Sequence, residues 1–113
     1  MALLSKQSIS AADDFKYAIV ECPEWGGDVR VRGLTAAEQS NIYKRYNDGK
    51  SEDFDVLLVT MGCVDEDGNR VFTNDDKDML RKKSFAVLDR IAKKVIELTG
   101  DNTEEGIEAA RKN

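Results

Sequence analysis

Two groups of carboxylates are the side chains best suited to hold a metal ion in this chain of 113 residues. The first is Asp65 to Asn69, in which three acidic residues precede a glycine and an asparagine. Such turns can bind Ca²⁺, but an EF-hand loop needs glycine at its sixth position and glutamate at its twelfth. Counted from Asp65, those positions hold Arg70 and Asp76. We therefore expect an acidic surface turn and no calcium site.

The second group is Asp75, Asp76 and Asp78, which could hold a hard cation. Three basic residues, Arg81, Lys82 and Lys83, follow this group closely. Acids in the first turn and bases in the last are typical of a helix, because they complement its dipole. We therefore interpret the group as the start of a helix. The chain contains no histidine, the commonest zinc ligand and general base. We expect no metal and no cofactor.

The two cysteines, Cys22 and Cys63, are the remaining candidates for covalent chemistry. Neither has a histidine to activate it, and they do not form a Cys-x-x-Cys motif. We expect reduced, buried or half-buried thiols, with a disulfide between them as the alternative. Gly26-Gly27 lacks the rest of any nucleotide-binding motif, and no serine lies in a nucleophile elbow. These observations predict that the chain is not an enzyme.

The elements that carry these residues predict an α+β domain that is mostly α, with an N-terminal β-hairpin followed by four to five helices. Phe15 to Cys22 is dense in β-formers, and Pro23 ends that strand. Trp25 to Asp28 forms the turn, since Gly-Gly supplies positive φ angles. Val29 to Arg32 alternates between valine and arginine, which is typical of a strand buried on one face.

Helix boundaries follow from capping signals. Thr35 and Glu38 form a capping box that begins a helix to about Tyr46, with Gly49 as its left-handed end. Ser51 caps a second, strongly apolar helix. Thr73 or Asn74 caps a third, after a small hairpin or extended loop over residues 63–73. A fourth helix runs from Ser84 to Leu98, its apolar face formed by Leu88, Ile91, Val95 and Leu98, helped by Phe85 and Ile96.

The chain divides into a flexible N-terminal arm (1–14), one globular domain (15–100) and a short charged C-terminal helix or tail (101–113). The N-terminus does not resemble a signal peptide, and no apolar run approaches the roughly 20 residues that span a bilayer. We therefore expect a cytoplasmic protein without membrane contact. A net charge of −5 argues against nonspecific nucleic-acid binding, which depends on basic residues.

The candidate site residues are those of a protein interface. Trp25 lies at the hairpin turn, and Arg30 and Arg32 share one strand face. Tryptophan and arginine are enriched at interface hot spots, so we assign these three residues to partner binding. The alternative is that Trp25 covers the core and the two arginines are solvated.

The same hairpin resembles the tail assembly chaperones of long-tailed, siphovirus-type bacteriophages. The stretches that carry this resemblance span nearly the whole chain: Leu3–Ile9 with Ala11–Asp14, Trp25–Gly27, Val29–Thr35 with Glu38, Val64–Gly68 with Val71–Thr73, and Ser84 and Leu88–Arg90 leading to Leu98–Gly100. The resemblance implies a mainly helical fold and no enzymatic activity.

The resemblance also implies partners. Such chaperones coat the tape measure protein, keep it soluble and help to recruit tail tube subunits during tail morphogenesis. They act in the host cell cytoplasm and are absent from the finished virion. Some members pack head-to-tail into spirals, so we expect self-association that can be open and helical. The alternative role is a structural tail or head–tail component that stays in the virion.

Overall fold

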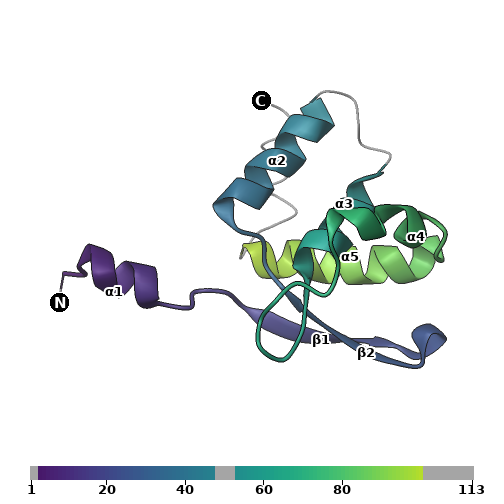
Figure 1. Ribbon diagram of the computed structural model, residues 1–113, viewed down its shortest axis with the longest axis horizontal. Helices are drawn as coiled ribbons and strands as arrows, with labels where there is room; N and C mark the ends of the chain where they lie inside the picture. The colour runs from purple at the N-terminus through teal and green to yellow at the C-terminus, as the bar shows by residue number, and fades with distance from the viewer. Residues whose placement is uncertain (1–2, 48–52, 101–113) are drawn as a thin grey trace.

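A computed structural model describes residues 3–47 and 53–100 of the chain (Figure 1). In chain order, its elements are α1 (Lys6–Ala11), β1 (Tyr17–Cys22), β2 (Gly27–Arg32), α2 (Ala36–Asn47), α3 (Phe54–Gly62), β3 (Cys63–Val64), α4 (Lys77–Arg81) and α5 (Phe85–Thr99). The mostly helical α+β architecture with an N-terminal hairpin is confirmed.

The hairpin pairs β1 with β2 in antiparallel register from Tyr17 opposite Arg32 to Cys22 opposite Gly27. A short 3₁₀ turn, Pro23–Trp25, connects the strands, and Gly26 follows it with φ of +83°. The prediction that both glycines lie in the turn was wrong, because Gly27 already belongs to β2. One left-handed residue is enough to reverse the chain after a 3₁₀ turn.

A third strand begins the segment predicted as a small hairpin or extended loop, and Val64 bridges Arg70 across its turn. The sequence did not predict that this strand extends the sheet. Val64 pairs with Arg30 and Cys63 with Val31, giving the strand order β1-β2-β3. The turn that follows is closed by the Asp65 carboxylate, which accepts hydrogen bonds from the N–H groups of Asp67 and Asn69 at 2.9 and 3.0 Å. The acidic turn expected here is therefore present, and it is tied to the edge of the sheet.

Helix α5 covers one face of this sheet and α3 packs against α5, and the three together form the core (Figure 1). Residues Val56–Gly62 of α3 are all buried, as its apolar composition predicts. Gly62 allows the two helices to approach, since a Cβ there would lie 2.5 Å from a methyl group of Val95. The prediction that Phe85 helps the apolar face of α5 was wrong: Phe85 is 72% exposed, because it lies in the first turn of α5 at an open hollow beside the start of α3.

Two of the three predicted helix caps lie in the described residues, and both are confirmed. At the start of α2, the Glu38 N–H donates to Thr35 Oγ1 at 3.1 Å, and the Thr35 N–H donates to Glu38 Oε1 at 2.8 Å. Thr73 and Asp76 form a second capping box before α4. The expected helix end at Gly49, the cap at Ser51 and the C-terminal segment 101–113 lie outside the described residues.

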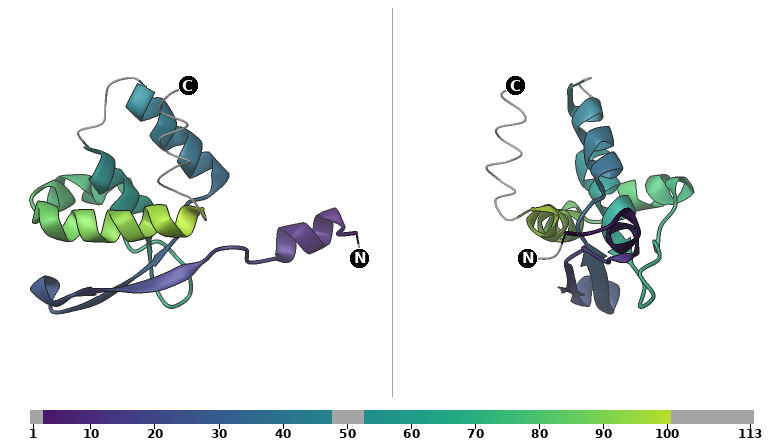
Figure 2. Two further views of the ribbon diagram at one scale, coloured as in Figure 1. Left: turned by 180° about the vertical axis from the view of Figure 1, so that it is seen from behind. Right: turned by 90° about the vertical axis from the view of Figure 1, so that its left-hand side faces the viewer.

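Helix α1 lies apart from the rest of the domain, at the end of an extended segment (Figures 1 and 2). Ser5 caps it through a hydrogen bond from the Ser8 N–H at 3.1 Å, and none of its residues is buried. The N-terminal arm therefore contains one short helix that is exposed to solvent.

Candidate interaction surface

The sheet has a second face, opposite α5, on which the predicted arginines lie. Residues directly opposite in an antiparallel pair project to the same side, so Tyr17 joins Arg32 and Ile19 joins Arg30 there. Within the described residues, no helix packs on this side (Figure 2). We call this surface, formed by these four residues and the Val64–Asn69 turn, the outer sheet face.

Arg30 is held at the middle of the outer sheet face. Its guanidinium lies 4.0 Å from the centre of the Tyr17 ring, within the range of a cation–π interaction. Its Nη1 donates to the carbonyl oxygen of Asp65 at 2.9 Å, which fixes the acidic turn to the sheet. The Tyr17 hydroxyl donates to Asp13 at 3.0 Å, and this bond is the main cause of the raised pKa of Tyr17. Arg30 is half-buried and can still contact a partner.

Arg32 has a different environment, since it is only 7% exposed. Its Nη1 and Nη2 donate to the two carboxylate oxygens of Glu38 at 3.0 and 3.3 Å, and Nη1 also donates to the Gly33 carbonyl at 2.6 Å. Phe15 covers the guanidinium, with its ring centre 4.7 Å away. The alternative hypothesis, in which both arginines are solvated, is therefore wrong for Arg32. Glu38, at the start of α2, supplies its counter-ion.

Glu38 joins three parts of the chain through one carboxylate. Besides Arg32 and the Thr35 N–H, it accepts a hydrogen bond from Arg70, which follows the acidic turn. Burial alone would raise the pKa of Glu38, but the bonds from Arg32, Thr35 and Arg70 outweigh it and lower the pKa to about 2. Glu38 is therefore ionised at neutral pH and fixes β2, α2 and the turn after β3 to one another.

Trp25, the third predicted interface residue, lies at the far end of the hairpin and is half-buried against the core. The structure thus brings Arg30 and Arg32 onto one face but places Trp25 away from them. Sequence reasoning missed Glu38 and Arg70 as neighbours of these arginines. The capping box singled out Glu38, but no local signal linked it to a residue 32 positions later.

An acidic groove of about 550 Å³ opens on the outer sheet face. Its apolar lining comes from Ile19 and Val64, and its charged lining from Asp28, Arg30, Asp65, Glu66 and Asp67. Ile19 is 59% exposed, which leaves a large apolar side chain open to a partner beside four carboxylates. The groove can therefore accept an apolar side chain that has a basic residue next to it.

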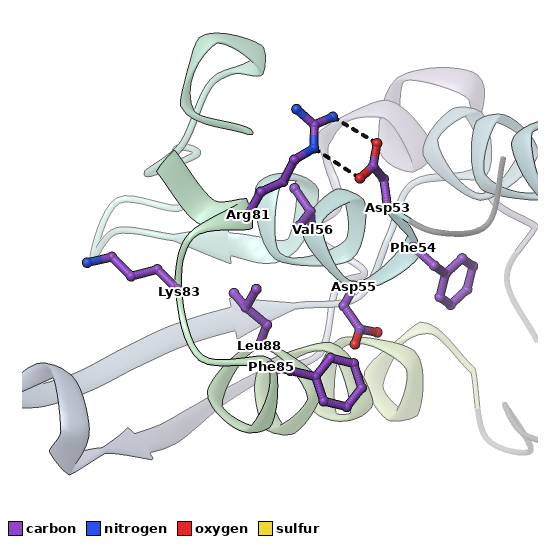
Figure 3. A pocket seen from close by; sticks show the side chains of 8 residues that line it. All are labelled: Asp53, Phe54, Asp55, Val56, Arg81, Lys83, Phe85 and Leu88. Atoms are coloured by element: carbon purple, nitrogen blue, oxygen red, sulfur yellow. Dashed lines mark hydrogen bonds and ion pairs between the residues drawn. The ribbon is translucent and has the colours of Figure 1, made fainter. Parts of the chain in front are cut away.

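A second hollow, of about 270 Å³, lies between the start of α3 and the start of α5 (Figure 3). On one side, Arg81 donates from Nε and Nη2 to the Asp53 carboxylate at 3.0 and 2.8 Å. On the other side of the hollow, the side chains of Phe54, Asp55 and Phe85 project in the same direction as one another. Burial and the nearby Asp89 carboxylate raise the pKa of Asp55.

The thiols are not arranged for catalysis. Cys22 and Cys63 are free and buried, as expected, and burial raises the pKa of Cys63 to about 12. A thiol with such a pKa is protonated at neutral pH and is a poor nucleophile. Within residues 3–47 and 53–100, no three cysteine or acidic side chains are placed to hold a metal ion. Over the same part of the chain, no helix has the length and apolar character needed to cross a membrane.

The hairpin-based sheet, the buried α3 and the covering α5 give this chain a fold shared with a bacteriophage tail assembly chaperone. The solved structure is that of the bacteriophage HK97 tail assembly chaperone, with a TM-score of 0.63 at 23% sequence identity. The match covers 81% of this chain and 90% of that one. The fold implied by the sequence resemblance is therefore confirmed. No protein-family model and no curated protein matches the chain.

Proposed function

We propose that this chain is a phage tail assembly chaperone that binds and solubilises the tape measure protein and helps to recruit tail tube subunits during tail morphogenesis. The observation that carries the proposal is the fold shared with the HK97 chaperone over most of both chains. The sequence resemblance, found independently of the structure, favours the same role. Such a protein acts in the host cell cytoplasm and leaves before the virion is complete.

The outer sheet face supports a binding role. It combines an exposed Ile19, a half-buried Arg30 and an acidic rim on a rigid three-stranded sheet. An apolar centre with a charged rim is the usual anatomy of a protein interface. Arg30 and Trp25 remain our candidates for contact with a tail protein, while Arg32 acts through the internal ion pair with Glu38. We also propose that the chain self-associates, because coating a long partner requires many neighbouring copies.

The proposal is tested by co-expressing the chain with the tape measure protein of the same phage, followed by co-purification and light scattering. We expect the tape measure protein to become soluble and to elute with many copies of the chain. A tape measure protein that stays insoluble while the chain elutes alone would contradict the proposal. In that case, detection of the chain in purified virions would favour the second candidate, a structural tail or head–tail component.

A further inference from the structure

The N-terminal arm, from Leu3 to the middle of α1, presents large apolar side chains that no other described residue covers. Leu3, Leu4 and Ile9 are 95%, 72% and 61% exposed. Leu4 precedes the Ser5 cap and Ile9 is the fourth helical residue, the two positions that lie together in a hydrophobic staple. The arm therefore carries a compact apolar patch at the start of its helix.

A helix of this kind needs a docking surface. It has six residues, whereas isolated helices shorter than about 12–15 residues are marginal in water. Most helical stability comes from packing an apolar face, and α1 has no buried residue within its own chain. The extended segment after it directs the helix away from the sheet and from α5 (Figures 1 and 2). No part of residues 3–47 and 53–100 supplies such a surface to α1.

The acidic groove is complementary to the arm in charge and in apolar character. Between Leu3 and Ala12, the only charged residue of the arm is Lys6, which lies between Leu4 and Ile9 in the sequence. The groove offers the exposed Ile19 as its apolar contact, with Glu66 and Asp67 among its acids. Its one base, Arg30, is already bound to the Tyr17 ring and to the Asp65 carbonyl.

We propose that α1 of one copy docks into the acidic groove of a second copy, with Leu4 and Ile9 against Ile19 and with Lys6 facing Glu66 and Asp67. The arm and the groove are different surfaces, so the contact is heterologous and leaves one arm and one groove free at the ends of any assembly. Successive copies therefore add without closing. This inference rests on the self-association in the proposed function and assigns its interface.

The first test is the molecular mass of the purified full-length chain, alone, by sedimentation velocity over a range of concentrations. The wild-type chain is expected to form oligomers that grow with concentration. Ile9→Asp removes the arm contact and Ile19→Asp removes the groove contact, and each is expected to weaken association by roughly tenfold or more. Val71→Asp, at an exposed apolar residue outside both surfaces, is the matched control and should assemble like the wild type. Circular dichroism checks that every variant is folded.

A mixture of the two variants gives the sharper test. Ile9→Asp keeps an intact groove and Ile19→Asp keeps an intact arm, so a one-to-one mixture should form heterodimers that grow no further. Lys6→Glu should weaken association of the otherwise wild-type chain, and Lys6→Glu combined with Glu66→Lys should restore it.

A mixture that remains monomeric would overturn the proposal, as would an Ile19→Asp variant that assembles like the wild type. A wild-type chain that is monomeric at every concentration would also overturn it. These experiments contain no tail protein, so their result is separate from the test of function. A monomeric chain that solubilises the tape measure protein would overturn the arm-and-groove contact and the self-association, but not the binding of the tape measure protein. An assembling chain that fails to solubilise it would overturn only the chaperone role.

Discussion

Arg32 and Glu38, six residues apart, form a two-pronged ion pair in which both side chains are about nine-tenths buried. The pair joins the end of β2 to the first turn of α2, and Arg70 completes it from the turn after β3. A buried ion pair is a weak source of net stability, but removing one partner leaves the other as an uncompensated buried charge. The consequences of this arrangement can be measured.

Replacing Glu38 by glutamine tests the ion pair. Glutamine keeps the shape and can still complete a capping box, so the change removes mainly the charge. We expect a loss of about 3 kcal/mol in the free energy of unfolding, because Arg32 is left buried without a counter-ion. Urea denaturation measures the loss. Glu97→Gln is the control, since Glu97 forms an exposed pair with Lys94, and it should change stability by less than about 0.5 kcal/mol. Equal effects of the two substitutions would contradict the assignment.

The stability of the protein should depend on pH through the same carboxylate. The pKa of Glu38 is lowered from 4.5 to about 2 in the folded state, so folding favours the ionised form. The resulting stabilisation is fully present above about pH 4.5 and is lost as the pH falls towards 2. It amounts to roughly 3 kcal/mol. Denaturation of the wild type and of Glu38→Gln at pH 6, 4, 3 and 2 should give a stability difference that shrinks over this window. A difference that stays constant would show that Glu38 has an ordinary pKa.

Glycine at position 33 is required by a close approach between β2 and the end of α5. A Cβ on Gly33 would lie 2.5 Å from the carbonyl oxygen of Leu98, and backbone there cannot move aside as a flexible side chain can. We expect Gly33→Ala to destabilise the fold by about 2 kcal/mol or more, measured as a lower melting temperature. Gly27→Ala is the matched control, since nothing lies within 4 Å of its Cβ position, and it should be close to neutral. Equal melting temperatures for the two variants would contradict the close contact.

Local signals predicted most of the fold. The capping residues Thr35 and Thr73 and the apolar spacing of α5 each act within one or two helical turns, so the sequence alone contains them. The place of β3 in the sheet was not predicted, because two residues are too few to show an alternating pattern. Its pairing with β2 depends on residues more than 30 positions apart.

The site was only partly predictable for the same reason. Alternation along β2 placed Arg30 and Arg32 on one face correctly. It could not show that Glu38 and Phe15 enclose Arg32 while Arg30 stays half-exposed, because that difference depends on where α2 begins in space. Trp25 was assigned to the interface by residue type, and the hairpin places it at the opposite end from Arg32.

Arg30 provides the most direct test of the outer sheet face in partner binding. Its guanidinium is half-buried over Tyr17 and outside the core, so Arg30→Ala should keep the domain folded. The change removes a fixed positive charge and the hydrogen bond that holds the acidic turn. We expect at least about fivefold weaker retention of the tape measure protein in co-purification, the loss typical of a hot-spot arginine. Arg81→Ala is the control, because Arg81 is likewise a partly exposed arginine with fixed partners, here the Asp53 carboxylate, but lies at the second hollow. Light scattering of each variant alone separates an effect on self-association from an effect on the partner. If both variants retain as much tape measure protein as the wild type, the partner binds elsewhere on the chain.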